Sequence, residues 1–249
     1  MRIALISDVH ANLPALEAVL ADIDVRSPDA IYHLGDLVGY APWPNEVVQL
    51  LRGRHIPGVS GNYDSTVATH YKHCGCKYED PCQEALSHQS FAWTVAQTTD
   101  ASKAFLGALP FRLDVRLNGG HLSGPTLVLV HGTPTLNTLY WTEDRSDDFC
   151  LKMAAQAGAK AGDTIAFGHT HRPWTREIEG VRFVNTGSVG RPKDGDWRAG
   201  YMLFTHSGEG MTVEGIRVDY DLDRAMDGIR RSTLPIDFAD YLRTGGTPR

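Results

Sequence analysis

The sequence is poor in cysteine and has no long hydrophobic segment. Its four cysteines in 249 residues are too few and too unevenly spaced for the disulfide framework of a secreted domain of this size. No segment reaches the roughly 18 apolar residues of a membrane span, and the apolar start of the chain meets Asp8 before any signal-peptide cleavage site. We therefore expect reduced thiols, no membrane partner and a cytoplasmic location.

The sequence also has no block of positive charge. Its 24 lysines and arginines are spread along a chain of formal net charge -6, which argues against general binding to nucleic-acid backbones or anionic membranes. With 42% hydrophobic and 22% charged residues and no internal repeat, the composition is that of a globular protein. We expect a single domain over residues 1–249, and the sequence leaves a homo-oligomer open.

Short apolar segments alternate with amphipathic ones in the first 60 residues. Strands are predicted over residues 2–7, 30–34 and 56–59, and helices over residues 12–25 and 45–51. This alternation is typical of an α/β fold with a largely parallel sheet. The remaining expected elements are strands over residues 127–130 and 164–167, antiparallel strands of a second sheet around 176–184, 199–204 and 211–218, and a helix over 221–231.

The segment of residues 65–109 is mainly polar and helical in character, and we expect it to form an insertion or cap outside the sheet. It contains Cys74, Cys76 and Cys82, with histidines nearby that suggest a structural zinc. The Cys-x-Cys spacing does not match the common two-knuckle zinc pattern. Reduced, packed thiols are the favoured interpretation, and the zinc site is the alternative.

Side chains suited to metal binding follow the predicted strands, at the points where the strands end. Because ligands of open α/β sheets bind at the carboxyl ends of the strands, these side chains should converge. Oxygen and imidazole donors without a thiolate suit hard or borderline divalent cations, and seven groups exceed one tetrahedral site. The sequence therefore predicts two metal ions, held among Asp8, His10, Asp36, Asn62, His131, His169 and His171.

Each of these residues also has a purely structural explanation when it is taken alone. Asp8 could cap the following helix, and the Gly-Asp pair at Asp36 could be a simple turn. His169 and His171 alternate in an extended segment, which projects both imidazoles to one side. Structural roles alone would have to place all of these groups at strand ends by coincidence, so we favour the metal site.

Five ordered motifs resemble those of the calcineurin-like metallophosphoesterases, over residues 1 to about 200. They are Asp8-x-His10, Gly35-Asp36, Gly61-Asn62-Tyr63-Asp64, His131-Gly132 and Gly168-His169-Thr170-His171. The segment of residues 185–195 is similar to one in the small bacterial and archaeal phosphodiesterase branch of that family. The resemblance implies a four-layer α/β sandwich, with two mixed β-sheets packed face to face and helices outside.

The resemblance also implies a dinuclear centre and a reaction. One metal would be held by Asp8, His10, Asp36 and His171, and the other by Asp36, Asn62, His131 and His169, with Asp36 as the bridge. Two divalent ions, from among Mn, Fe, Ni, Zn and Co, would hold a hydroxide nucleophile and stabilise the phosphoryl oxygens. The implied activity is hydrolysis of small-molecule or nucleotide phosphodiesters. The candidate catalytic residues are Asp36, Asn62, Tyr63 and Asp64.

The residue after Asn62 departs from the family pattern. It is commonly histidine, thought to assist the leaving oxygen, whereas this chain has Tyr63. The ordinary pKa of a phenol, about 10, is poorly matched to acid catalysis near neutral pH. Asp64 is either a support for the metal ligands or a helix cap. The departure keeps open one alternative, a non-catalytic scaffold that binds another protein. A second alternative, a phosphomonoesterase for nucleotides or phosphoproteins, would have the same site and differ only in its pocket.

Two further groups lie near these motifs in the sequence. Arg191 and Lys193 are candidates for contacting a phosphate, with a solvated surface as the alternative. Tyr40 and Trp43 follow Asp36 and are placed to touch a substrate, and Trp141 is a further candidate for the wall of a pocket.

Overall fold

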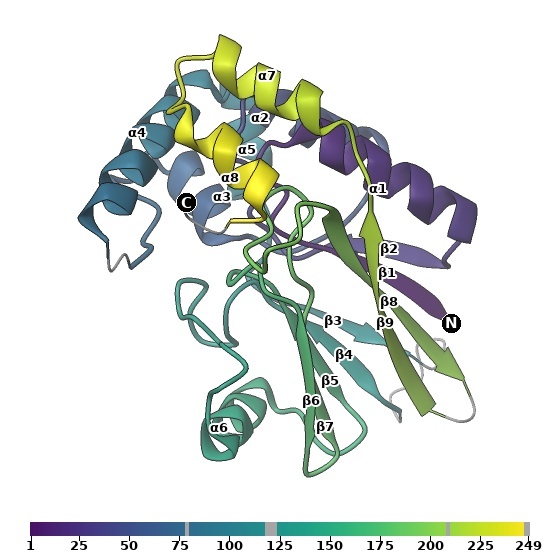
Figure 1. Ribbon diagram of the computed structural model, residues 1–249. Helices are drawn as coiled ribbons and strands as arrows, with labels where there is room; N and C mark the ends of the chain where they lie inside the picture. Colours follow the sequence, from purple (N-terminus) through teal and green to yellow (C-terminus); the bar gives the residue numbers. More distant parts are fainter. Residues whose placement is uncertain (78–79, 118–123, 208–209, 247–249) are drawn as a thin grey trace.

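The computed structural model describes residues 1–249 except 78–79, 118–123, 208–209 and 247–249, and it consists of two β-sheets stacked face to face with helices outside (Figure 1). The first sheet has the strand order β2-β1-β8-β9. Strand β1 pairs in parallel with β2 and antiparallel with β8, so this sheet is mixed. Its strands are β1 (Arg2–Ile6), β2 (Ala30–His33), β8 (Ala199–Ser207) and β9 (Gly210–Val218).

The second sheet has the strand order β3-β4-β5-β7-β6. Strands β4, β5 and β7 run parallel to one another, and the edge strands β3 and β6 pair antiparallel with them. Both sheets are therefore mixed, as the resemblance implied. The strands are β3 (Leu113–Arg116), β4 (Thr126–Leu129), β5 (Thr164–Phe167), β6 (Trp174–Ile178) and β7 (Val181–Asn185).

Alternation along the strands explains the stacking of the sheets. In β1, Ile3 and Leu5 point into an apolar core between the sheets, where residues such as Leu127 of β4 also lie. The intervening Ala4 and Ile6 belong to a separate core beneath the helices. A strand that is apolar on both faces needs a layer on each side, which is why β1 lies between the second sheet and the helices.

The helices form the two outer layers. Most cover the first sheet, where their apolar faces share one core with β1 and β8, whereas α6 (Asp147–Ala157) covers the outer face of the second sheet (Figure 1). The predicted four-layer α/β sandwich is thus confirmed. The helices on the first sheet are α1 (Leu13–Arg26), α2 (Pro44–Gly53), α3 (Asn62–Ala68), α4 (Pro81–Gln97), α5 (Asp100–Gly107), α7 (Leu222–Arg231) and α8 (Asp237–Thr244).

Two predictions about strands were wrong. Residues 56–59 form a single parallel bridge between Gly58 and His33 instead of a strand, because Pro57 has no backbone N–H to extend the ladder. The expected second sheet of antiparallel strands is divided in the structure. Strands β6 and β7 form a hairpin in one sheet, whereas β8 and β9 join β1 and β2 in the other, because β8 supplies a face to each of two cores.

The segment of residues 65–109 is helical, as expected, and contributes most of α3 together with α4 and α5. Phe91 of α4 and Leu106 of α5 join the core beneath the helices. Its description as an insertion or cap on a single domain stays a prediction. Within the described part of the chain, no helix combines the length and the apolar character needed to cross a membrane.

Candidate metal centre

The seven side chains predicted to bind metal lie together at one edge of the two sheets, and all of them are buried. They come from the loops that follow β1, β2, β4 and β5 and from the start of α3. The two sheets present their strand ends to the same space, which brings residues more than 160 positions apart into contact. The seven residues are Asp8, His10, Asp36, Asn62, His131, His169 and His171.

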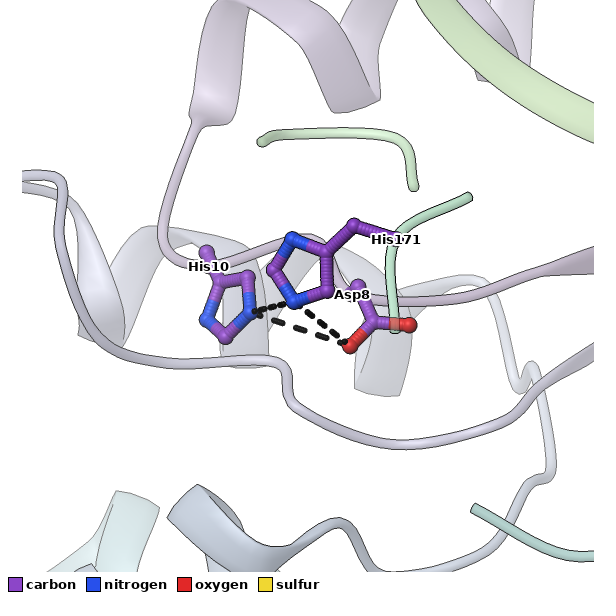
Figure 2. Close-up of side chains that lie close together, drawn as sticks. All are labelled: Asp8, His10 and His171. Carbon is purple, nitrogen blue, oxygen red and sulfur yellow. Dashed lines mark hydrogen bonds and ion pairs between the residues drawn. The ribbon is translucent and has the colours of Figure 1, made fainter. Parts of the chain in front are cut away.

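The first ligand group consists of Asp8, His10 and His171 (Figure 2). The His171 Nε2 atom lies 3.3 Å from Asp8 Oδ1 and 3.1 Å from His10 Nε2. The distance from His10 Nε2 to Asp8 Oδ1 is 3.7 Å. Three donor atoms therefore face a common point, an arrangement that suits a single cation.

The second ligand group consists of Asp36, His131 and His169. Asp36 Oδ2 lies 3.5 Å from His131 Nε2 and 3.7 Å from His10 Nε2, so this carboxylate reaches both groups. Asn62 adds its Oδ1 atom, which lies 3.0 Å from His131 Nε2. The geometry agrees with the assignment of Asp36 as a bridge, which stays a prediction.

Three of the histidines are oriented by backbone carbonyl groups. The Nδ1 atoms of His10, His131 and His171 lie 3.1, 2.7 and 2.6 Å from carbonyl oxygens. A proton on Nδ1 that is donated to a carbonyl leaves the Nε2 lone pair directed into the centre, as a metal ligand requires. The accepting carbonyls are those of Val38, Leu34 and Arg191, respectively.

The residues present fit two divalent cations. Asp8 Oδ1 and His169 Nε2 are buried and have no hydrogen-bond partner in the part of the chain that the structure describes. Buried polar atoms without a partner are costly, and one such atom belongs to each ligand group. Carboxylate oxygen, amide oxygen and imidazole nitrogen are donors for divalent metals such as Mn, Fe, Co, Ni and Zn. Binding of such cations would satisfy both atoms.

Backbone strain accompanies the site. Five of the seven residues predicted to bind metal have left-handed backbone angles, a conformation that is uncommon for residues other than glycine. They follow β1, β2 and β5, where each chain turns sharply to present its side chain inward. The φ angles are 52° at Asp8, 48° at His10, 52° at Asp36, 66° at His169 and 61° at His171.

Two glycines of the motifs are explained by close packing. A Cβ atom on Gly61 would lie 2.1 Å from Asp36 Oδ1, and one on Gly168 would lie 2.3 Å from Asp8 Oδ2. A side chain at Gly61 would therefore displace the carboxylate of Asp36, and one at Gly168 would displace that of Asp8.

Asp64 has both of the roles considered for it. Its carboxylate accepts hydrogen bonds from the backbone N–H groups of Asp36 (2.8 Å), Leu37 (2.9 Å) and Gly61 (2.9 Å). It thus caps α3 and ties that helix to the loop that carries Asp36. Burial and the negative charge of Asp36 raise the pKa of Asp64 to about 7. Asp64 therefore supports the loop that carries Asp36, and its part in catalysis stays a prediction.

The two ligand groups differ in protonation. Burial and the charge of His171 lower the pKa of His10 to about 3, and burial and the charge of His131 lower that of His169 to about 4. Burial also acts on His131, but attraction to Asp36 outweighs it and raises the pKa of His131 to about 9. His131 and Asp36 therefore form an ion pair in the metal-free protein, whereas the other imidazoles are neutral.

Three tyrosines pack on the centre. Tyr63 is buried in the first turn of α3, and its backbone N–H donates to Asp36 Oδ1 over 2.9 Å. The ring of Tyr63 lies 5.5 Å from the ring of His10, and that of Tyr40 lies 4.9 Å from it. The ring of Tyr140 lies 4.4 Å from that of His169. Sequence analysis missed Tyr140, and only its position in the loop after the His131 motif could have indicated it.

One tryptophan proposed for the wall of a pocket is part of the core. Trp141 is fully buried and stacks on Phe167 with ring centres 4.4 Å apart, so it belongs to the core beneath α6. Trp43 is partly buried and packs against Gly228 and Arg224 of α7. The expectation of substrate contact thus fails for Trp141, and it stays a prediction for Trp43 and Tyr40.

The cysteine loop borders the second ligand group. The Asn62 Nδ2 atom donates to the carbonyl of Cys74 (2.9 Å) and contacts Cys76 Sγ (3.3 Å), which turns its Oδ1 atom toward His131. Cys74 is buried, whereas Cys82 is exposed. Among the described residues, no cluster of potential metal ligands includes these thiols, and their interpretation as reduced, packed cysteines stays a prediction.

The sequence is similar to a known protein family and to a protein of an archaeon. The chain matches the family model described as the calcineurin-like phosphoesterase superfamily domain over residues 1–209. It is 31% identical over 256 residues to an uncharacterized protein of Methanocaldococcus jannaschii, a match that covers 94% of this chain and 93% of the relative.

Solved structures show the same fold. A metallophosphoesterase from Sphaerobacter thermophilus superposes with a TM-score of 0.73 at 29% identity, covering 98% of this chain and 99% of that one. A hypothetical protein from Pyrococcus horikoshii superposes with a TM-score of 0.81 at 21% identity, covering 100% and 99% of the two chains. The second likeness concerns the fold alone.

Proposed function

The chain belongs to the calcineurin-like phosphoesterase superfamily and is a metal-dependent phosphoester hydrolase, and within that class we propose that it is a dinuclear phosphodiesterase. Its proposed substrates are small-molecule or nucleotide phosphodiesters. The observation that supports the dinuclear centre most strongly is the pair of buried ligand groups, each with one donor atom that lacks a hydrogen-bond partner in the described residues.

The proposed ligand sets follow from the contacts at the centre. Asp8, His10 and His171 would hold one cation, and His131, His169 and Asn62 the other, with Asp36 shared. Divalent cations there would activate a water molecule as the nucleophile and stabilise charge on the phosphoryl oxygens during in-line displacement. Manganese is our first candidate among Mn, Fe, Ni, Zn and Co.

Hydrogen bonds within the protein hold Asp8 and Asp36 in fixed positions. The Asp8 Oδ2 atom accepts from Ser7 Oγ (2.6 Å) and from the backbone N–H of His169 (3.0 Å), which leaves Oδ1 for the cation. Asp64 holds the backbone of Asp36 through three N–H groups of the surrounding loops. Such support keeps metal-binding atoms in one geometry and preserves affinity.

A preference for diesters over monoesters is supported by the segment of residues 185–195. This segment resembles one from the phosphodiesterase branch, and it braces two of the metal-binding turns. The Ser188 hydroxyl donates to the carbonyl of Asp8 (2.7 Å), and the Asn185 amide donates to the carbonyl of Gly168 (2.7 Å). A small-molecule partner and a cytoplasmic location complete the proposal.

Metal analysis combined with paired substrates tests this function. The purified protein is reloaded with each candidate metal, and hydrolysis of bis(4-nitrophenyl) phosphate is compared with that of 4-nitrophenyl phosphate. We expect two ions per chain and faster cleavage of the diester, with Asp36→Ala as the inactive control. Faster cleavage of the monoester would make the protein a phosphatase. Absence of cleavage of both esters with two metals bound would favour the protein-binding scaffold.

A further inference from the structure

Arg191 is a buried cation beside the first ligand group. Its side chain is only 8% exposed, and its guanidinium carbon lies 3.8 Å from the ring centre of Tyr40 and 5.5 Å from that of Phe238. Tyr40 in turn contacts His10 edge to face. The carbonyl of Arg191 accepts from His171 Nδ1, so the residue is fixed to the centre at its backbone as well.

The guanidinium of Arg191 has no hydrogen bond or ion pair within the described residues. This differs from the other arginines of the same region. Arg198 is bound to both oxygens of Asp196, and Arg217 is paired with Asp194. An arginine that is nine-tenths buried and lacks a carboxylate retains donors that no protein group uses, so these donors are available to a ligand.

Lys193 brings a second positive charge to the same place. It is half-buried two residues after Arg191, and no carboxylate within the described part of the chain pairs with its ammonium group. The backbone N–H of Lys193 donates to the carbonyl of His171 over 3.4 Å, so this residue directly adjoins the first ligand group. The expectation that these residues form a solvated surface is therefore wrong for Arg191, because Tyr40 and Phe238 enclose it.

A charge balance at the centre leaves the positive side chains of Arg191 and Lys193 without a full negative counterpart. Two divalent cations carry four positive charges, of which Asp8 and Asp36 offset two. A hydroxide nucleophile and a monoanionic diester offset the other two. Asp64, already satisfied by three backbone N–H groups, offsets at most one more. When the substrate is a simple diester, at least one of the positive charges of Arg191 and Lys193 therefore lacks a negative partner.

We propose that Arg191 and Lys193 form a subsite for a second phosphate group of the substrate, next to the scissile phosphodiester. The proposal rests on the phosphodiesterase function and narrows its substrates to diesters that carry a further phosphate. A guanidinium suits this role because its planar fork donates two parallel hydrogen bonds to phosphate oxygens. Stacking on Tyr40 and Phe238 would hold that fork in place at little entropic cost.

Equilibrium binding to the manganese-loaded protein tests the subsite without turnover. Calorimetry compares thymidine 3′,5′-bisphosphate with thymidine 5′-phosphate, and methylenediphosphonate with methylphosphonate, so each pair differs by one phosphate or phosphonate group. We expect the second group to tighten binding about 10-fold or more in at least one pair, the usual effect of hydrogen bonds to charged groups. Equal affinities within both pairs would overturn the proposal.

Variants distinguish a phosphate subsite from a general effect of positive charge and from an effect of side-chain packing. Arg191→Met keeps the apolar stack, and we expect it to bring the affinity ratio within each pair close to one. Arg191→Lys should restore part of the ratio, and Lys193→Met should lower it by a smaller factor. Arg198→Met removes a paired, partly exposed arginine of the same segment and is the matched control. A ratio that survives in Arg191→Met, or falls equally in Arg198→Met, would contradict the assignment.

A turnover measurement keeps this inference separate from the proposed function. The 4-nitrophenyl ester of thymidine 5′-phosphate is compared with the same ester carrying a 3′-phosphate. Binding preference without cleavage of either ester would support the subsite and refute the phosphodiesterase. Cleavage of both esters with no preference in binding or in kcat/KM would support the phosphodiesterase and refute the subsite.

Discussion

The two ligand groups have the same composition, one aspartate and two histidines, but differ in what surrounds them. The first group faces Arg191 and Lys193, and its histidines His10 and His171 are anchored on backbone carbonyls. In the second group, the negative charge of Asp36 keeps the His131 imidazole protonated. The first ligand group thus has positively charged neighbours, whereas the charge of Asp36 dominates the second.

This difference in charge affects the binding of a cation in the second group and the attraction of an anionic substrate in the first. In the second group, the raised pKa of His131 lets its imidazolium pair with Asp36, so a cation bound there would have to displace a proton. In the first group, neighbouring positive charges oppose a cation but attract an anionic substrate. Asp36 lies within 4 Å of a histidine from each group and so connects the two settings.

Removal of the shared carboxylate is the most severe way to disrupt both groups. We expect Asp36→Ala to lose both metals or to keep one weakly bound, and to lower kcat by about 1,000-fold, because charge stabilisation in the transition state depends on both cations. Metal analysis and diester turnover measure the two effects, with the exposed His88→Ala as control. Saturation of the unmutated protein at one ion would refute a dinuclear centre.

Tyr63 connects the groups in a second way, since its N–H bonds Asp36 while its ring packs on His10. If it is a poor acid, the rate should depend steeply on the leaving group, so that aryl diesters are cleaved much faster than alkyl diesters. We expect Tyr63→His to speed up alkyl esters by about 10 to 100-fold and to leave activated aryl esters nearly unchanged.

Rates of a series of diesters with different leaving-group pKa values measure this dependence. Tyr63→Phe is the matched control, because it keeps the ring without a donor. A shallow dependence in the unmutated protein would show that an efficient acid already assists the leaving oxygen.

The contrast in protonation is directly measurable in metal-free protein. Histidine NMR signals should show His131 protonated up to a pKa of about 9, whereas His10 and His169 should stay neutral down to pKa values of about 3 and 4. A cation at the second group displaces the His131 proton below pH 9, so its affinity there should fall about tenfold for each pH unit below 9. A measured pKa of His131 near the ordinary value of histidine would contradict the difference in protonation between the two groups.

The smallest expected effect concerns the cysteine loop, which contacts Asn62 beside the second group. We expect Cys74→Ser together with Cys76→Ser to keep two metals per chain and to cost about 1 kcal/mol or less of unfolding free energy for each site, because a packed thiol behaves as a small hydrophobe. Metal analysis and denaturant unfolding test this. Loss of a tightly bound zinc together with the fold would establish the structural zinc instead.

Sequence patterns predicted the strands that carry the site better than the elements around it. Each of the predicted strands β1, β2, β4 and β5 is a short apolar segment followed at once by a motif, which is a local signal. Helix α6 was missed although its ends are marked, since Ser146 caps its start and Gly158 ends it with φ of 65°. Helix α8 was missed because no side chain caps its first turn.

The ligand types and their position after strands were determined by the sequence alone, because strand ends and motifs are local features that a chain of this kind repeats. Only the tertiary structure decided what surrounds each group. The ion pair of His131 with Asp36 and the burial of Arg191 against Tyr40 join residues distant in sequence, and no periodicity encodes them. Burial strengthens such interactions, so the charge environment of each ligand group emerges only when the two sheets meet.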